Sequence, residues 1–170
     1  ATAIPGTTLT NRATATSSVP DVNPDNNTGE TSLVVAPIAD LVTTITGPTQ
    51  FTVGVSQPYE FVVTNQGGAP TTGPITLVIT LPQGAVATLT PPAGWTYTLV
   101  GSTLTLTSNN VVPSLGIVRF PIQLSFPLDG ATRIDARVGG GGEAVTSNND
   151  ASLALSGTAD TTAPISVVER

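Results

Sequence analysis

Carboxylates are the main side chains of this sequence that could carry out chemistry. The chain has seven Asp and four Glu, no His, no Cys and no Lys, and its five basic residues are all Arg. Without His it lacks the commonest general base and metal ligand. Without Cys it has no thiolate chemistry and no disulfides, and without Lys it can form neither a Schiff base nor a Lys–Asn crosslink. An enzyme built on it would need paired carboxylates, as glycosidases use. The carboxylates are scattered over turns and strand edges without a motif, so we predict no catalytic residues and no enzyme.

One loop gathers oxygen ligands of the kind that Ca²⁺ prefers. Residues 17–27 are dense in Asx and Pro, and the oxygen ligands in and just after this loop are Asp21, Asp25, Asn27 and Glu30. Their spacing lacks the alternating Asp-x-Asp-x-Asp-Gly order of a calcium loop. We therefore interpret the loop as solvated turn-forming residues and predict no metal and no cofactor, with a Ca²⁺ site as the alternative. The same loop contains an N-glycosylation sequon, Asn26-Asn27-Thr28, a motif short enough to arise by chance.

The aromatic pair Trp95 and Tyr97 is open to two interpretations. An exposed pair of rings two residues apart would be a platform for stacking sugars. A lone Trp in a β-rich chain is more often the anchor of a sandwich core. Since the chain has only seven aromatic residues, we favour the core.

The composition excludes several classes of partner. The formal net charge is −6 and charged residues make up only 9% of the 170 residues, against about 25% in ordinary soluble domains. An acidic chain with scattered Arg does not fit nucleic acid, and no apolar run is long enough to span a membrane. Polarity comes instead from 30 Thr, a residue suited to the outer face of a strand. This composition favours an exported protein of the cell surface, and the start Ala-Thr-Ala would suit a processed N-terminus.

The elements that position these residues are strands. In Tyr59–Leu81, two segments of alternating apolar and polar residues flank a loop rich in Gly and Pro, which places one set of side chains on a core face. The same pattern recurs along the chain, and we expect strands at 7–16, 28–35, 39–45, 50–53, 95–100, 103–108, 117–126, 132–138 and 151–156. We interpret 85–94 as a connector, and we expect Pro121 to place its strand at a sheet edge or a bulge. Segments 39–45 and 50–53, broken by Gly47-Pro48, indicate a strand that changes direction or sheet.

An internal repeat defines the domain organisation. Asp25-Asn26-Asn27 is followed by Ala39-Asp40, and about 120 residues later Ser147-Asn148-Asn149 is followed by Ala159-Asp160. This offset suits one sandwich module. We therefore predict three parts: a hairpin at 1–35 equivalent to the last two strands of a preceding module, a complete sandwich at 36–156, and a strand or linker at 157–170. Its strand, 164–168, would open a further module or complement a neighbour.

The order of several short motifs resembles a known family. They are Thr52-Val53-Gly54, Tyr59–Gly67, Leu81-Pro82-Gln83-Gly84, Gly94-Trp95-Thr96-Tyr97, Gly101–Thr107, Pro24–Thr28 and Ala39-Asp40-Leu41. Together they are similar to an immunoglobulin-like "conserved repeat" family, of unknown function, found in large bacterial and archaeal surface proteins. Where members often have two Cys, this chain has Tyr97 and Leu106, which implies an apolar cross-strand pair in place of a crosslink. The resemblance implies a spacer or stalk module and no activity.

The sequence thus predicts an all-β, immunoglobulin-like antiparallel sandwich of about seven to nine strands with an extra N-terminal hairpin and a C-terminal strand. The predicted function is structural: a repeat-module subunit of an extracellular stalk, sheath or filament. The unpaired backbone groups of the orphan hairpin could be satisfied by folding onto the same sandwich, by the chain being a piece of a longer array, or by completing a neighbouring subunit. The third alternative is head-to-tail assembly by strand complementation. The expected partners are copies of itself or neighbouring repeat modules, with no nucleic acid and no membrane insertion. The alternative is an adhesin or carbohydrate-binding module whose partners are surface glycans.

Overall fold

The computed structural model of the chain describes residues 6–159 and 161. It divides the chain into two compact units, Ala1–Ile38 and Ala39–Arg170. The predicted strand at 164–168 lies outside the described residues. No helix in the described part of the chain is long and apolar enough to cross a membrane.

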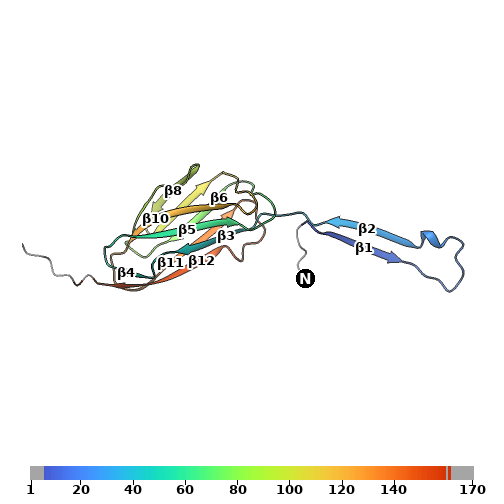
Figure 1. Cartoon of the computed structure of the whole chain (residues 1–170), viewed down its shortest axis with the longest axis horizontal. Coiled ribbons are helices and arrows are strands. Elements are labelled where there is room, and N and C mark those ends of the chain that lie inside the picture. The colour runs from blue at the N-terminus through green and yellow to red at the C-terminus, as the bar shows by residue number, and fades with distance from the viewer. Residues whose placement is uncertain (1–5, 160, 162–170) are drawn as a thin grey trace, which may run out of the picture. The chain divides into compact units, whose positions relative to one another are not determined.

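The first unit is a two-stranded antiparallel hairpin (Figure 1). Strand β1, Thr8–Thr14, pairs with β2, Thr28–Val34, in a register that runs from Thr8 opposite Val34 to Thr14 opposite Thr28. The 3₁₀ turn η1, Pro24–Asn26, lies in the loop between them. Every residue of both strands is exposed, so this unit has no core of its own.

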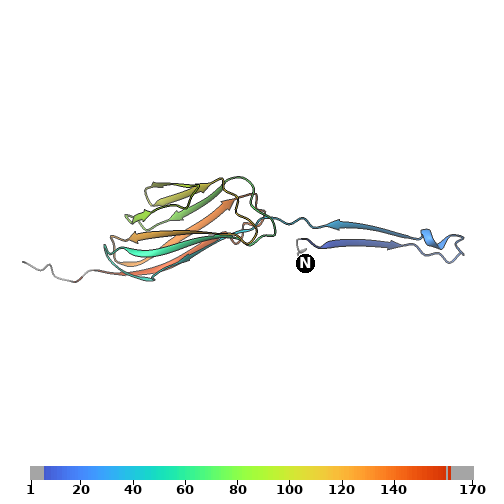
Figure 2. The same cartoon turned by 45° about the horizontal axis from the view of Figure 1, so that its top comes forward.

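The second unit is a two-layer β-sandwich, and Figure 2 shows its layers edge-on. The smaller sheet has four strands in the order β3-β5-β10-β7, all antiparallel. Their bounds are Leu41–Thr46 for β3, Gln57–Asn65 for β5, Ile117–Ser125 for β10 and Val86–Leu89 for β7. Alternation decides which residues face inward: in β5, Tyr59, Phe61 and Val63 are buried between less buried neighbours.

The larger sheet has six strands in the order β4-β12-β11-β6-β9-β8. Their bounds are Gln50–Thr52 for β4, Asp150–Thr158 for β12, Gly130–Gly140 for β11, Ile75–Thr80 for β6, Thr103–Ser108 for β9 and Trp95–Val100 for β8. The pairings are antiparallel except that of β4 with β12, which is parallel. The predicted change of sheet after β3 is confirmed, because β3 and β4 belong to different sheets.

The inner faces of the two sheets form one hydrophobic core. Aromatic rings join the layers: Trp95 of β8 meets Phe120 of β10 edge-on, with ring centroids 4.8 Å apart. Phe126 contacts Phe51 at 4.6 Å and Tyr59 at 6.0 Å. Edge-on and tilted contacts of this kind add to the hydrophobic gain from burial. The predicted two-layer sandwich is therefore confirmed.

Three local predictions need comment. The sandwich has ten strands rather than seven to nine, partly because the stretch interpreted as a connector, 85–94, contains β7. The two strands of the segment Tyr59–Leu81 lie in opposite sheets, so the loop between them crosses the sandwich. The prediction that Pro121 lies in an edge strand is wrong, because β10 lies between β5 and β7. Proline is tolerated there because β7 pairs with β10 only from Ile122 onward, which leaves Pro121 with one strand neighbour, β5.

Candidate functional site

The polar side chains gathered where the chain enters the sandwich form the most elaborate network of the second unit. At its base is Asn65, whose side chain is fully buried at the end of β5. Its Oδ1 accepts the backbone N–H groups of Asp40 and Gly67. Its Nδ2 donates to the backbone carbonyls of Ala69, Val112 and Pro113. One amide thus fixes the start of the module and two of its loops, which is a structural role.

Asp40, which Asn65 bonds through its N–H, belongs to a second group of four side chains. We call this group the carboxylate–amide cluster: Asp40, Glu143, Asn148 and Asn149. Asn148 donates its Nδ2 to Asp40 Oδ1 at 2.9 Å. Asn149 donates its Nδ2 to Glu143 Oε1 at 2.7 Å and to the carbonyl of Val138 at 2.8 Å. Glu143 Oε2 accepts the N–H of Leu41 at 2.9 Å. The cluster therefore joins the first residues of the module to the loop of its final hairpin.

Glycines bring Glu143 into this position. Gly140, Gly141 and Gly142 have φ values of 92°, 64° and 73°, in the left-handed region that other residues avoid. Gly141 also donates its N–H to the carbonyl of Pro74 at 2.8 Å. The chain leaving β11 is thereby turned back over the start of β3. The run of four glycines, 139–142, therefore positions the carboxylate of Glu143 beside the N–H of Leu41.

Two oxygen atoms of the cluster have no donor. The side-chain Oδ1 atoms of Asn148 and Asn149 are buried and have no hydrogen-bond partner, and Asn149 as a whole is 1% exposed. The ion pairs in the described part of the chain are Arg119–Glu60, Arg133–Asp135 and Arg137–Asp150, all at the surface. Neither carboxylate of the cluster takes part in them. The cluster therefore combines two carboxylates without an Arg partner and two buried amide oxygens without a donor.

Sequence reasoning missed the cluster as a site. Asn148, Asn149 and Asp40 were recognised only as repeat motifs, and Glu143 was not singled out. A signal was present, because the Asn pair and the Ala-Asp motif recur together at both ends of the chain. Their contact in the fold, across 108 residues, explains why the two motifs occur as a set.

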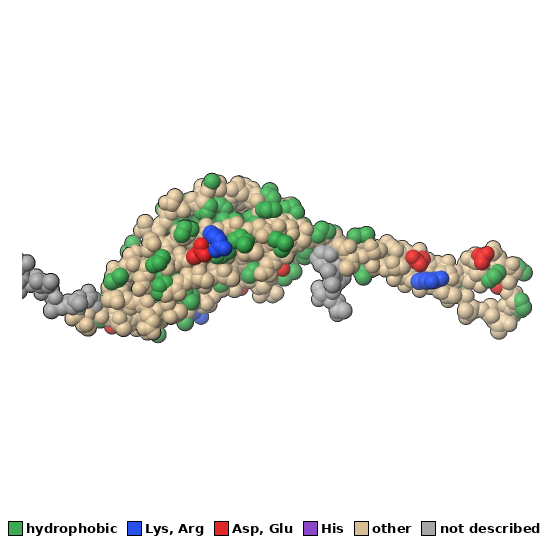
Figure 3. Space-filling view, in the orientation of Figure 1, with side chains coloured by type: hydrophobic (Ala, Val, Ile, Leu, Met, Phe, Trp, Pro, Cys, Tyr) green, Lys and Arg blue, Asp and Glu red, His purple; other side chains and the backbone are tan. Residues whose placement is uncertain are grey.

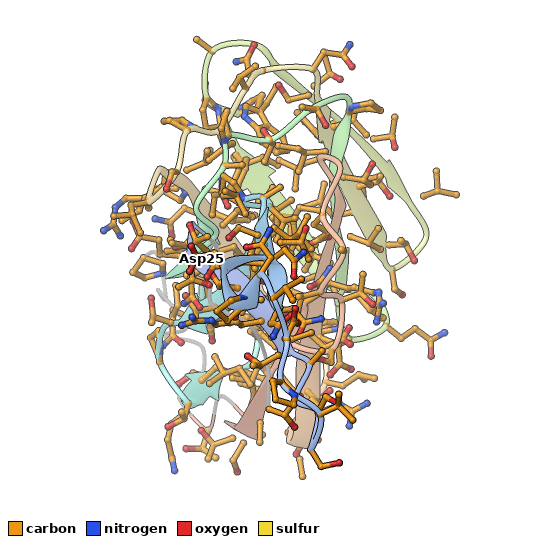
Figure 4. All side chains as sticks on the ribbon, turned by 90° about the vertical axis from the view of Figure 1, so that its right-hand side faces the viewer. Asp25 is labelled. Atoms are coloured by element: carbon orange, nitrogen blue, oxygen red, sulfur yellow. The ribbon has the colours of Figure 1, made fainter. Side chains whose placement is uncertain are left out.

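The oxygen ligands around the hairpin loop do not gather in the same way. Asp25, labelled in Figure 4, lies in η1 and is exposed, as are Asp21 and Glu30. Asp21 Oδ1 accepts the N–H of Asn23 at 2.9 Å, an Asx turn that supports the interpretation as turn chemistry. Within the described residues, no three His, Asp or Glu side chains come together as a metal site.

The aromatic pair is divided between core and surface. Trp95 is 5% exposed and Tyr97 is 45% exposed. All seven aromatic residues lie in the described part of the chain, and the other five are buried. Tyr97 pairs directly with Leu106 in the register of β8 and β9, as the resemblance implied. Since Trp95 is buried, Trp95 and Tyr97 do not form the exposed pair of rings that the alternative interpretation requires.

The surface of the sandwich carries few charges. Figure 3 shows, on the face in view, that charged side chains lie as separate spots on a largely uncharged surface. This agrees with a charged fraction of 9%. The described surface therefore offers no strongly charged patch on this face for an ionic partner.

Comparison with known proteins supports the fold. No family model matches the sequence, and no curated protein matches it. Among solved structures, the CARDB domain of a Pyrococcus furiosus protein, crystallised in complex with di-metal ions, is 21% identical over 71% of this chain and 90% of that domain, with a TM-score of 0.52. The cohesin module of a Clostridium perfringens family 33 glycoside hydrolase is 12% identical over 74% of this chain and 100% of that module, also with a TM-score of 0.52.

A third structure, of an uncharacterized Nocardia farcinica protein described as revealing an immunoglobulin-like fold, is 17% identical over 67% of this chain and 97% of that one, with a TM-score of 0.49. The matches to the CARDB domain and the cohesin module cover almost the whole length of those two structures. The chain is an immunoglobulin-like β-sandwich module with an additional hairpin. At these identities the likeness shows the fold and no activity, and membership of the conserved-repeat family remains a prediction.

Proposed function

We propose that this chain is a structural module of the cell exterior that assembles with copies of itself or with neighbouring repeat modules through the hairpin β1–β2. One observation carries the proposal: the hairpin forms a unit of its own in which every strand residue is exposed. A hairpin of two strands is marginally stable in water unless it packs on something else. A partner surface would supply the packing that the hairpin lacks.

The edges of the hairpin are suited to strand addition. The bonds at its ends run from Ala15 N–H to the Asn27 carbonyl and from Val35 N–H to the Thr7 carbonyl. In an antiparallel ladder such bonded pairs alternate with unbonded ones, so Leu9, Asn11 and Ala13 bond across the hairpin. The N–H and C=O groups of Thr8, Thr10, Arg12 and Thr14 therefore point outward, where no second strand neighbours β1 in the described part of the chain. Such an edge is a template for another strand.

The side chains favour a partner as well. Leu9 and Leu33 are directly opposite each other and are 49% and 67% exposed. Val34, at the end of β2, is 62% exposed. Burying such a pair against another β-surface would stabilise the hairpin through the hydrophobic effect.

The composition supports the location and the absence of chemistry. A chain without Cys, His or Lys and with 30 Thr suits a durable module outside the cell and has no His or Lys to activate its hydroxyl groups. The chain is accordingly proposed to be a non-enzymatic repeat module of a stalk, sheath or filament.

The test compares assembly with and without the hairpin. Light scattering and negative-stain microscopy are applied to the full chain and to a chain lacking residues 1–35, which retains the whole second unit. We expect filaments or oligomers from the full chain and monomers from the truncated one. If both are monomers of equal stability, the self-assembly proposal is wrong, and the hairpin is the remnant of a neighbouring module in a longer array.

A pair of variants at one position refines this test. Thr10→Pro removes an outward N–H, while the cross-hairpin bonds of Leu9 and Asn11 are kept. Thr10→Val is the control, because it keeps that N–H. Both variants lose the 3.0 Å hydrogen bond between the hydroxyl groups of Thr10 and Ser32. Assembly through this edge predicts that the proline variant is monomeric and the valine variant assembles. Equal assembly by both would show that the outer edge of β1 is not the contact.

A further inference from the structure

The carboxylate–amide cluster of Asp40, Glu143, Asn148 and Asn149 combines features that a purely structural network would avoid. Its two carboxylates are joined through neighbouring groups, since Glu143 binds the N–H of Leu41, the residue after Asp40. Neither carboxylate is part of an ion pair of the described chain. Carboxylate oxygens without a positive partner are available as ligands for a cation.

The amide of Asn149 is the second, independent observation. It is almost completely buried, and its Nδ2 is held by two acceptors, Val138 O and Glu143 Oε1. Those two bonds fix the plane of the amide and leave Oδ1 buried without a donor. Because Nδ2 and Oδ1 are bonded to the same carbon, Oδ1 lies near the Glu143 carboxylate, whose Oε1 accepts the hydrogen bond from Nδ2 at 2.7 Å. A buried acceptor with no donor calls for a water or an ion, and the neighbouring charges favour the ion.

Asn148 repeats the arrangement on the Asp40 side. Its Nδ2 is bonded to Asp40 Oδ1 at 2.9 Å, and its Oδ1 is likewise buried without a partner. Two consecutive amides thus each contact one of the two carboxylates and each keep one unused oxygen. We infer that the cluster is a binding site for a divalent cation, held by the carboxylates of Asp40 and Glu143 and the amide oxygens of Asn148 and Asn149.

The ligand types select the ion. Carboxylate and amide oxygens are hard ligands, and the chain has no His or Cys to favour Zn²⁺ or another transition metal. Ca²⁺ accepts six to eight oxygens in irregular geometry, including waters, whereas Mg²⁺ requires a near-ideal octahedron. Four side chains from two loop segments, completed by water, fit Ca²⁺ better. Sites in extracellular modules bind Ca²⁺ with dissociation constants of about 0.1–1 mM, and we expect this range.

The bound ion would have a mechanical consequence. Asp40 lies at the first residues of the sandwich and the other three ligands lie in the loop of its last hairpin. An ion shared between them would fasten the beginning of the module to its end. This inference does not depend on the role of the hairpin β1–β2, since all four ligands belong to the second unit.

The test uses the full chain freed of metal with a chelator. Isothermal titration with CaCl₂ is expected to show one ion per chain, with MgCl₂ binding at least about tenfold more weakly. Thermal unfolding, followed by the fluorescence of Trp95, should shift to higher temperature as CaCl₂ is added, because a ligand that binds only the folded state stabilises it. No binding heat and no shift up to about 10 mM CaCl₂, ten times the weakest expected dissociation constant, would overturn the inference.

Variants and spectroscopy locate the ion. Glu143→Gln keeps the shape of the side chain and removes its charge, and should weaken Ca²⁺ binding at least about tenfold. Asp129→Asn makes the same charge change at an exposed position and should leave binding unchanged. Should the Glu143 variant fail to fold, amide chemical shifts of the wild-type chain decide the question. Calcium-dependent shifts centred on Leu41, Glu143 and Asn149 support the site, and shifts confined to other residues refute it.

Discussion

Replacing Asn65 by Ala tests how the loops of the sandwich are held. Its amide bonds five backbone groups, but not all would be orphaned. The carbonyls of Val112 and Pro113 also accept the N–H groups of Thr71 and Gly116. Within the described chain, the N–H groups of Asp40 and Gly67 and the carbonyl of Ala69 would each lose their one partner.

The cost can be estimated from these three groups. A buried polar group left without a partner costs about 1–3 kcal/mol. The bond to Gly67 is buried, while those to Asp40 and Ala69 are partly accessible, so water can replace part of what is lost there. We expect Asn65→Ala to lower the free energy of unfolding by about 3–5 kcal/mol, a large part of the 5–15 kcal/mol typical of a domain.

Urea unfolding followed by Trp95 fluorescence measures this change. Trp95 is the only Trp of the chain, and it is buried against Phe120, so its signal reports on the sandwich alone. Asn109→Ala, at an exposed position, is the control and should change the free energy by less than about 0.5 kcal/mol. If Asn65→Ala costs less than about 1.5 kcal/mol, well below the sum for three orphaned groups, the hydrogen bonds of Asn65 do not hold the loops as argued.

Other sites give further predictions. In Gly140→Ala the new Cβ would meet the Pro74 carbonyl at a φ of 92°, so we expect a loss of about 2–4 kcal/mol in urea unfolding; a cost no greater than that of Gly139→Ala, which meets open space, would contradict this. Burial raises the pKa of Tyr59 above 10.0, because the buried phenol favours its neutral form. Neutral Tyr59 therefore stabilises the fold fully below the unfolded-state pKa, and this stabilisation is lost as the pH rises through the folded-state pKa. Tyr59→Phe should remove that alkaline loss, and an unchanged pH profile would refute it. Tyr97→Thr should change stability by less than about 0.5 kcal/mol in the same assay, and a larger loss would place its ring in the core.

Period-two alternation predicted most of the strands, because one face of each is buried. In β5, β6 and β11 the residues assigned to the core are the buried ones. The strands 95–100 and 103–108 and the pairing of Tyr97 with Leu106 were also predicted and are confirmed. Strand β7 was missed because only four residues are involved, and Val86 and Thr88 are exposed. A short edge strand with one partner has little hydrophobic signal.

Alternation states which side chains face inward, but not which strands are neighbours. The segments on either side of the loop 66–74 read as a local pair, yet β5 pairs with β3 and β10, and β6 with β9 and β11. In a sandwich, a loop that crosses between sheets and a loop that closes a hairpin can have the same Gly and Pro content. The partition into two sheets therefore depended on long-range packing that local patterns do not encode.

The carboxylate–amide cluster lies beyond sequence reasoning for the same reason, and it gives the repeat a physical meaning. Asn148 and Asp40 are 108 residues apart and become neighbours only when the last hairpin returns to the first strand. If the repeat is structural, Asn26 and Asn27 of the isolated hairpin should play the corresponding part for the Asp of a preceding module. The hairpin then presents an amide pair whose carboxylate partner belongs to another module, and the proposed assembly would supply it. Under the proposed assembly, the strand edge and the amide pair, two features with different chemistry, would both contact the neighbouring module.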